Sequence, residues 1–420
     1  MTTTLCIFED GQYANLLPLA ALRPVWDLRC GILTLGQKIE HSWPGSKVRL
    51  ACRSYLAPLM QEEHPDRPLN APATGSCLFV NGRVLANAVL ARHIIPEGPD
   101  TVFVHNHTIV AVRASEQTLR GLGTDADGLP DLAALTALPR VDVACTLIRY
   151  PWDLVNANGG AITDDAALIA GNAPHLEGVK LYDGAHLVNP GAITVGRGSI
   201  IKPGAVLDAE KGPIVIGANV RIFPNAVIEG PAFVGGGSLI KIGAKIYENT
   251  SIGPMCKVGG EVEGSILHGF ANKQHDGFLG HAYLCPWVNL GADTNNSDLK
   301  NNYGSVRVTI NGTEVDSGSL FAGVIMGDHA KSAINTMFNT GTVVGVGSNV
   351  FGAGFPPKYI PAFSWGGAEG IETYAIDKCI DVARKVMLRR NQTLTSAGEA
   401  LLRHVFTLTQ DERTQSVRTS

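Results

Sequence analysis

A six-residue repeat of hydrophobic positions runs through the stretch from Ile216 to Val262. β-Branched residues occupy every sixth position there, namely Ile216, Ile222, Ile228, Val234, Ile240, Ile246, Ile252 and Val258. Four places after each of them stands a small or compact residue: Val220, Ala226, Ala232, Ser238, Ala244, Thr250, Cys256 and Val262. A period of six fits neither an α-helix nor a lone strand, but it is typical of a solenoid of short strands. The pattern therefore predicts a left-handed parallel β-helix of hexapeptide repeats, with one side chain per strand pointing inward.

A less regular form of the repeat flanks this stretch on both sides. Before it, the six-residue step is kept by Val195, Ile201 and Leu207, with an interruption at 208–213. After it, the step resumes at Ile334, Thr340 and Val346, with Phe338, Val344 and Val350 as second inward positions. Between these parts the step is broken after Val262, and residues 311–316 suggest a hairpin or an excursion. We therefore expect the β-helix to span residues 178–365, after a connector at 171–178.

Residues 1–170 carry a different pattern, in which hydrophobic runs alternate with helical segments. Strands are predicted at 4–8, 47–51, 77–80, 101–105 and 108–113, and short helices at 131–138 and 166–170. Strands interleaved with helices are typical of an α/β sandwich, so residues 1–170 are expected to form an α/β domain.

Residues 366–420 are expected to form a helical tail. Apolar residues recur at roughly helical spacing from Ile371 to Arg390, and a capping-box pattern at Ser396 opens a second helix. The last residues, 411–420, are polar and are expected to be disordered. The tail either caps the open end of the β-helix or packs across a trimer.

Composition narrows the classes of partner. A net charge of −4 argues against nucleic acid or an anionic membrane as the main partner. The eight cysteines include no Cys-x-x-Cys pair, so we expect buried free thiols in a reducing compartment rather than a zinc site. Neither a secretory leader nor a run long enough to span a membrane is present, and we expect a cytoplasmic protein.

A group of polar and cationic residues follows the first predicted strand. It comprises Asn15, Arg23, Arg29 and Lys38. A strand that leads into a loop with several cations could bring a phosphorylated ligand to the carboxyl end of a sheet. Solvated or core-paired arginines are the alternative, because no Gly-rich phosphate-binding motif is present.

The residues from Asn15 to Thr34, with Asn81-Gly-Arg83 and Pro151-Trp-Asp153, resemble the amino-terminal domain of an atypical branch of sugar-1-phosphate nucleotidyltransferases. The parent family includes the bifunctional N-acetylglucosamine-1-phosphate uridyltransferase / glucosamine-1-phosphate acetyltransferase, which joins such a domain to a left-handed β-helix. The resemblance implies that Asn15, Arg23, Arg29 and Lys38 bind a nucleoside triphosphate. Asp10-Gly11 replaces the family's Gly-rich loop, and Asn81 appears where its metal-binding aspartate is expected. The metal ligands are therefore unknown, although Mg²⁺ would serve nucleotidyl transfer.

The break in the repeat coincides with a block of polar residues at 270–307. A solenoid does not need these side chains for packing, so the block predicts a ligand surface. It is similar to the acetyltransferase site of the bifunctional family, where a His and an x-x-aromatic-Leu-Gly run lead to Val-Asn-x-Gly-Ala. The resemblance implies that His275 is the general base, that Asn289 binds substrate and that Ala292 contacts acetyl-CoA. A lone His is more often structural, but a near-neutral pKa suits it to accept a proton from an attacking amine.

The chain departs from this family at its sugar-phosphate cations. Lys245-Ile-Tyr-Glu and Glu263-Gly-Ser stand where the family has Ala-Arg-x-Arg-Pro and Glu-x-Lys. As substrate-binding candidates we take Lys245, Glu263, Lys273, Asn289, Lys300 and Tyr303. Lys331 is a candidate for the CoA phosphates, and a solvated surface lysine is the alternative.

Together these features predict a homotrimeric transferase of nucleotide-sugar biosynthesis. Its nucleotidyltransferase-like domain would use a sugar-1-phosphate and a nucleoside triphosphate, and its β-helix would N-acetylate an amino sugar with acetyl-CoA. One alternative is a nucleotidyltransferase for UTP or dTTP in which the β-helix only assembles the trimer. Another is a degenerate amino-terminal binding module that regulates the acetyltransferase.

Overall fold

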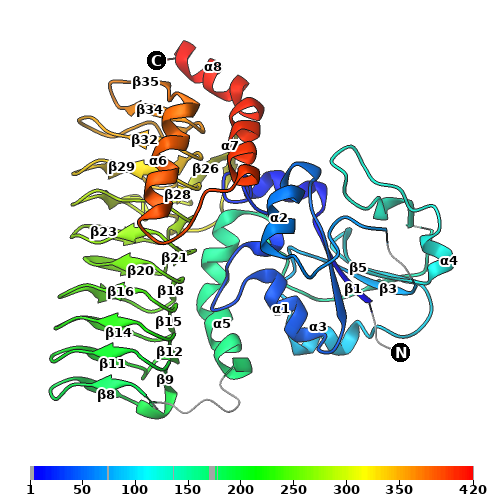
Figure 1. Cartoon of the computed structure of the whole chain (residues 1–420), viewed down its shortest axis with the longest axis horizontal. Coiled ribbons are helices and arrows are strands. Elements are labelled where there is room, and N and C mark those ends of the chain that lie inside the picture. The colour runs from blue at the N-terminus through cyan, green and yellow to red at the C-terminus, as the bar shows by residue number, and fades with distance from the viewer. Residues whose placement is uncertain (1–3, 73–74, 136, 170–175, 177, 420) are drawn as a thin grey trace. The chain divides into compact units, whose positions relative to one another are not determined.

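The computed structural model describes residues 4–72, 75–135, 137–169, 176 and 178–419. The chain divides into two compact units. The first unit comprises Met1–Leu16, Leu22–Leu28 and Leu33–Arg149, and the second comprises Leu17–Ala21, Arg29–Ile32 and Tyr150–Ser420. Figure 1 shows the first unit in blue and cyan and most of the second in green to red. The predicted connector at 171–178 lies almost wholly outside the described residues.

The first unit is built on a six-stranded mixed sheet. Its strand order is β2 (Lys47–Ala51), β1 (Thr4–Phe8), β3 (Cys77–Asn81), β5 (Thr108–Ala114), β4 (Thr101–His105) and β6 (Arg140–Asp142). β1 pairs in parallel with both β2 and β3, whereas β5 is antiparallel to its two neighbours. The helices of this unit are α1 (Leu35–Ser42), α2 (Ala57–Glu63), α3 (Ala88–His93) and α4 (Glu116–Leu119). The predicted α/β domain and its five predicted strands are confirmed.

The long helix before the boundary predicted at residue 170 belongs to the second compact unit. α5 (Pro151–Ile169) packs on strands β15 (Ala232–Val234) and β18 (Thr250–Ile252) of the β-helix. A Cβ added at Gly159 would lie 1.9 Å from the side-chain oxygen of Asn249, so a larger residue there would require the Asn249 side chain to shift. The predicted short helix at 166–170 is the end of α5, and the one predicted at 131–138 is a 3₁₀ turn at Leu132–Leu135.

The second unit contains the predicted β-helix, whose strands stack in parallel sheets. One sheet is ordered β22 (Asn272–Lys273), β19 (Lys257–Val258), β16 (Leu239–Ile240), β13 (Arg221–Ile222), β10 (Ile200–Ile201) and β7 (Lys180–Leu181). A second is ordered β23 (Phe278–Gly280), β20 (Glu261–Glu263), β17 (Lys245–Ile246), β14 (Val227–Glu229), β11 (Val206–Asp208) and β8 (His186–Val188). The third is ordered β33 (Tyr359–Ile360), β31 (Val343–Val344), β28 (Ile325–Met326), β24 (Tyr283–Leu284), β21 (Ile266–Leu267), β18, β15, β12 (Ile214–Ile216) and β9 (Ile193–Val195).

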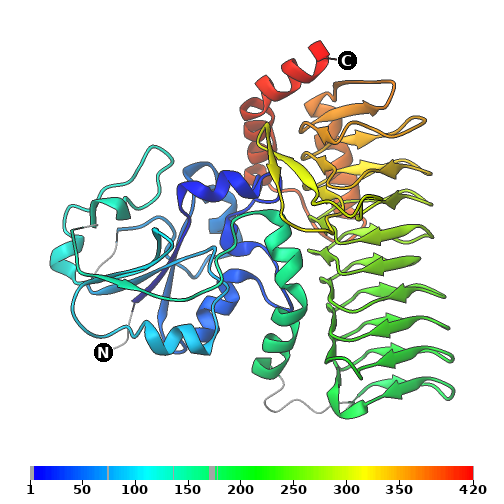
Figure 2. The same ribbon diagram turned by 180° about the vertical axis from the view of Figure 1, so that it is seen from behind.

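The upper coils complete the stack with smaller sheets. One is ordered β29 (Lys331–Ser332), β32 (Asn349–Val350), β34 (Ser364–Gly367) and β35 (Gly370–Thr373), and β25 (Asn295–Asn296) pairs with β30 (Met337–Phe338). The predicted excursion is a hairpin of β26 (Arg307–Ile310) and β27 (Thr313–Asp316), drawn in yellow in Figure 2.

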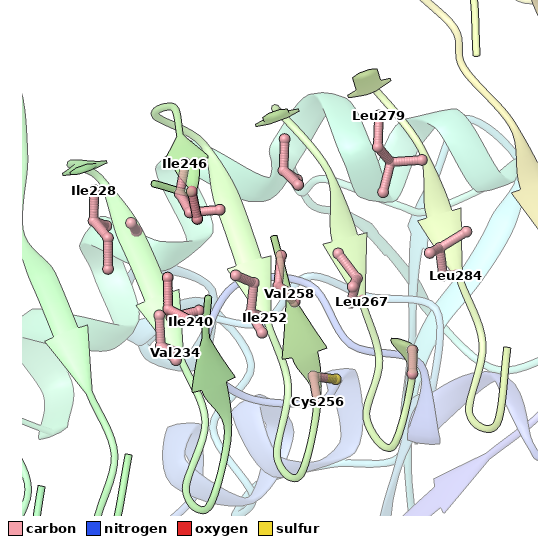
Figure 3. Close-up of a cluster of buried hydrophobic side chains, with 14 of the residues drawn as sticks. Ile228, Val234, Ile240, Ile246, Ile252, Cys256, Val258, Leu267, Leu279 and Leu284 are labelled. Atoms are coloured by element: carbon pink, nitrogen blue, oxygen red, sulfur yellow. The ribbon is translucent and has the colours of Figure 1, made fainter. Parts of the chain in front are cut away.

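The hexapeptide residues form the core of the β-helix. Figure 3 shows Ile228, Val234, Ile240, Ile246 and Ile252 pointing into the interior from successive strands. All five are completely or almost completely buried. In the regular part each inward residue pairs with the one eighteen positions later, as Ile222 does with Ile240. This spacing is three repeats of six, so one coil uses three hexapeptides.

The register changes after Val258, where the coils become shorter. Val262 pairs with Ile246, which is only sixteen positions earlier, and Lys273 pairs with Val258, fifteen positions earlier. Val262 is therefore an inward strand residue, and its predicted role as a compact corner residue is wrong. A regular six-residue repeat in the sequence does not indicate that one coil is two residues shorter than the others.

The tail is helical, as predicted, and packs on the β-helix of the same unit. It contains α6 (Ile376–Leu388), α7 (Ser396–Leu408) and α8 (Gln410–Thr419). Thr395, rather than Ser396, caps α7 by accepting a hydrogen bond from the Gly398 amide. The predicted disorder of residues 411–420 is wrong for 411–419, which lie in α8. None of the described helices combines the length and the apolar character that crossing a membrane requires.

Candidate functional site

The predicted general base lies on a loop between two short strands. His275 follows β22 and precedes β23, and its side chain is exposed. Its carbonyl oxygen accepts a hydrogen bond of 2.6 Å from the ammonium group of Lys273. The backbone of the loop is therefore fixed from inside the β-helix, while the imidazole faces outward.

Lys273 occupies a position that the repeat reserves for aliphatic residues. Its column contains Ile222, Ile240 and Val258 on the preceding coils. Only 2% of Lys273 is exposed, and burial lowers the pKa of its ammonium group to about 8, although nearby carboxylates such as Asp276 oppose that shift. The sequence placed Lys273 among the substrate ligands, but in the structure its amine is used within the coil.

The predicted substrate ligand Asn289 is connected to Arg390 of the tail by two hydrogen bonds through Asn272. Its side-chain oxygen accepts a hydrogen bond from Asn272, whose own oxygen accepts one of 2.6 Å from Arg390. Arg390 also donates to the carbonyl of Met255, and burial lowers the pKa of its guanidinium. Sequence reasoning missed Arg390, because a helical stripe of apolar residues does not indicate that the second residue after α6 contacts the β-helix.

The predicted acyl-CoA contacts lie on neighbouring coils. The carbonyl of Ala292 accepts a hydrogen bond from the Asn335 amide. The amine of Lys331 donates to the carbonyl of His329 at 2.7 Å, and burial lowers its pKa. Lys331 thus turns toward its own chain, as Lys273 does, and binding of CoA phosphates by Lys331 stays a prediction.

The remaining substrate candidates are spread over several turns. Lys245 forms an exposed ion pair of 3.1 Å with Glu261. Lys300 donates to the carbonyl of Ser305, and Tyr303, which is 70% exposed, lies in the same turn before the hairpin. No contact among the described residues joins these side chains to His275, so their role in binding substrate stays a prediction.

A second histidine lies at the other end of β23 and is paired with a carboxylate. Nδ1 of His281 lies 2.8 Å from Oδ2 of Asp298, and its ring stacks on Phe321 at 4.8 Å between centroids. Glu263 lies beside the pair, and burial raises the pKa of its carboxyl group while the His281 charge opposes this. His281 had no predicted role. His281 and Asp298 are seventeen positions apart, as are the paired core residues Val262 and Leu279, and the six-residue repeat did not indicate this spacing.

In the first unit, two ion pairs, one buried and one partly exposed, lie at the carboxyl ends of the parallel strands. Glu9, after β1, pairs with Arg53, after β2, at 3.1 Å, and both side chains are inaccessible to solvent. The carboxylate of Glu9 also accepts a hydrogen bond from the Val25 amide. Asp10 is hydrogen-bonded to Arg83 at 2.8 Å and to Asn81 at 2.8 Å. The cations at this edge are thus neutralised by carboxylates of the same unit.

These pairings do not fit a magnesium ion. Asn81, which stands where the family's metal ligand is expected, donates to Asp10, and Asp10 is held by Arg83. Among the residues that the structure describes, no three His, Cys, Asp or Glu side chains are grouped so that they could hold a metal ion. We therefore assign no step to Mg²⁺.

Three of the four predicted nucleotide ligands, Asn15, Arg23 and Lys38, lie in the first unit. Arg23, which is buried, lies 3.8 Å from Asp27, Asn15 donates to Gln12, and Lys38 is buried in α1. Nucleotide binding by these three stays a prediction.

Arg29 belongs to the second unit, where its surroundings are those of a structural residue. Its Nε donates to the carbonyl of His268, its amide donates to the Tyr283 hydroxyl, and its guanidinium lies over the Phe233 ring. The adjacent Ile32 amide donates to Asp165 of α5 at 2.8 Å. Of the alternatives that the sequence left open, the structure thus favours a core-paired arginine for Arg29.

Comparison with known proteins supports part of this picture. Residues 5–173 match the family model of the sugar nucleotidyl transferases. No curated relative matches the chain. The match confirms the predicted resemblance of the amino-terminal segment to sugar nucleotidyl transferases and, with it, the prediction of a transferase.

Several solved structures are similar to parts of the chain. The UDP-N-acetylglucosamine acyltransferase of Francisella novicida is 16% identical with a TM-score of 0.27, over 53% of this chain and 73% of that one. The Campylobacter jejuni enzyme is 15% identical with a TM-score of 0.23, over 55% of this chain and 95% of that one. The Arabidopsis enzyme is 13% identical with a TM-score of 0.21, over 58% of this chain and 96% of that one. Scores this low carry no weight in the functional argument, which rests on the residues of the chain.

Proposed function

We propose that the β-helix of this transferase acetylates the amino group of an amino sugar with acetyl-CoA. The observation that carries the proposal is the broken part of the solenoid. In that part, the polar segment from His275 to Ala292 interrupts the repeat. The buried Lys273 donates a hydrogen bond to the backbone of the loop that carries the exposed His275.

The chemistry requires one group that accepts a proton near neutral pH. The amine nitrogen attacks the thioester carbonyl carbon, a C–N bond forms, and the nitrogen passes a proton to an imidazole. The C–S bond then breaks, and the CoA thiolate takes that proton to leave as a thiol. The sequence resemblance assigns the imidazole to His275.

The test is an assay of the purified full chain with acetyl-CoA and a panel of amino sugars and amino-sugar-1-phosphates. Release of CoA thiol that depends on the sugar, together with an acetylated product by mass spectrometry, is the expected result. Thiol release that does not depend on any amino sugar, or none at all, would contradict the proposal.

Nucleotidyl transfer in the first unit is the second candidate, because residues 5–173 match the sugar nucleotidyl transferases. Pyrophosphate release from UTP or dTTP with a sugar-1-phosphate would support it, with the β-helix as a scaffold. Binding of these ligands by calorimetry without turnover would instead support a regulatory binding module. The pairing of Arg53 with Glu9 and of Arg83 with Asp10 favours the module, since it leaves these two cations neutralised.

For the assembly we propose a homotrimer through the flat faces of the β-helix. Exposed apolar residues on the coils, such as Ile242 and Ile334, support an assembly of this kind. The inward position predicted for Ile334 is wrong, because 69% of this residue is exposed. Light scattering at micromolar concentration should give three chain masses, and a monomer mass would contradict it.

A further inference from the structure

The coil that carries His275 presents two histidines, one at each end of β23. His275 and His281 are six positions apart, with the bend at residues 275–277 and the strand β23 between them. Each of the two imidazoles is therefore a separate candidate for the base.

The two histidines differ in how their rings are held. Among the described residues, no hydrogen bond of the His275 imidazole is found, and its side chain is exposed. The His281 ring is hydrogen-bonded to Asp298 and stacked on Phe321. A catalytic imidazole is expected to be oriented by a third group, because a ring that is already fixed loses no conformational freedom when the substrate binds.

We propose that His281, and not His275, accepts the proton from the acceptor amine, with Asp298 as its positioning residue. This proposal rests on the proposed acetyl transfer and names the residue that performs it.

The geometry determines which nitrogen of His281 would act. A carboxylate oxygen only accepts, so the hydrogen bond of 2.8 Å requires Nδ1 of His281 to carry the proton. Nε2 is then the free basic nitrogen. Gly264 lies next to it, since an added Cβ at that glycine would approach Nε2 to 3.1 Å, so the absence of a side chain there leaves space.

The charges around the ring suit an amine substrate. Among the described residues, the charged side chains found to interact with His281 are Asp298, on the next coil, and Glu263, on the preceding one. Both are acidic, so they favour an approaching ammonium group and stabilise the imidazolium that forms when Nε2 takes the proton. His281 and Asp298 are 22% and 12% exposed, so the pair is partly shielded but open to a ligand.

His281→Asn is the most direct test, because the asparagine amide can still donate to Asp298 but cannot accept and release a proton. We expect kcat for acetyl transfer to fall by roughly 10²–10⁴-fold, the usual size of general-base catalysis, with little change in KM for acetyl-CoA. The matched control is His186→Asn, an exposed histidine of β8 in the same unit, which should leave kcat unchanged.

Asp298→Asn tests the positioning role through the pH dependence of kcat, which would not change if Asp298 were only structural. Loss of the carboxylate destabilises the imidazolium, so the apparent pKa of the rising limb of the kcat–pH curve should shift to lower pH. This variant also keeps the proposal testable if His281→Asn lowers the melting temperature and cannot be assayed.

His275→Ala completes the set, and the results separate two kinds of failure. A large loss in His281→Asn with retained activity in His275→Ala supports the proposal. Normal kcat in His281→Asn, or an unmoved pH profile in Asp298→Asn, overturns it and returns the role to His275, while the acetyl transfer stands. A wild-type chain with no acetyl transfer overturns the proposed function and this inference together.

Discussion

Two stretches of the same β-helix follow different rules. From Ile193 to Val258 the inward positions are aliphatic and successive coils are mostly eighteen residues apart, as between Ile240 and Val258. The second stretch runs from Glu261 to Asp298. Its first coils shorten to fifteen, sixteen or seventeen residues, and Lys273 and Asn296 take buried positions. The inward residues of the first stretch serve only to pack the core. The second breaks the pattern in the same coils that carry both candidate histidines.

Two buried polar residues of the second stretch, Asn296 and Lys273, have partners that explain their presence. The side chain of Asn296 accepts from the Gly280 amide at 3.0 Å and donates to the Gly280 carbonyl at 2.9 Å. It thereby joins β25 to β23, which belong to separate sheets. Lys273 fixes the carbonyl of His275. Sequences depart from local consistency chiefly at functional sites, so the second stretch is where chemistry is expected.

The largest effect is expected from a polar residue placed in the first stretch. Ile240 is fully buried and no partner for a carboxylate is available among its aliphatic neighbours. Ile240→Asp should cost several kcal/mol, which approaches the total stability of a domain, and should prevent folding. Arg221→Asp is the control, since Arg221 is an exposed residue of β13, which pairs with the strand of Ile240. Equal melting temperatures for Ile240→Asp and wild type would mean that the inward register is wrong.

The β-helix could be predicted because its signal is local and repeated. Every inward residue from Ile216 to Val258 adds the same information, and short parallel strands need no distant partner to specify their register. The α/β character of the first unit was equally accessible from the runs at Thr4–Phe8 and Lys47–Ala51.

The boundary of the units was not accessible, for a physical reason. α5 is apolar on most of its surface, and its partners Asn249 and Phe233 lie some 70–90 positions away in sequence. The four residues from Arg29 to Ile32 join it through hydrogen bonds to Asn158 and Asp165. Hydrophobic periodicity describes the faces of a helix but not what covers them.

The sequence predicted the region of the candidate site but not which of its side chains lie together. The density of Asn, Lys and His at 270–307 correctly indicated where the repeat is interrupted. The pairing of His281 with Asp298 depends on a coil of seventeen residues, which follows from the shortening after Val258. A fixed step of six cannot place two residues that a change of step has brought together.

An intermediate effect is expected from removal of the polar link inside the second stretch. Asn296→Ala leaves the buried amide and carbonyl of Gly280 without their side-chain partner. Each unsatisfied group costs about 1–3 kcal/mol, so the free energy of unfolding should fall by a few kcal/mol. The exposed Asn301→Ala is the control. Chemical denaturation should resolve the two variants, and identical midpoints would show that Asn296 does not join the two sheets.

The smallest effect, and the one that compares the two stretches most directly, is expected from Lys273→Met. This substitution gives the column of Ile240 and Val258 the apolar residue that the repeat calls for. The variant loses the hydrogen bond to His275, worth about 1 kcal/mol, but no longer buries an ammonium group. At pH 7 it should be as stable as wild type or more stable.

The sign of the pH dependence follows from the pKa of Lys273, which is about 8 when folded against 10.5 when unfolded. Between these values the unfolded wild type binds more protons than the folded form, so wild-type stability rises with pH. The advantage of Lys273→Met should therefore shrink from pH 8 to pH 10.5, whereas Lys180→Met, at an exposed position of β7, should show no such trend. A constant difference across that range would mean that Lys273 titrates as an ordinary lysine and that the second stretch does not bury a charge.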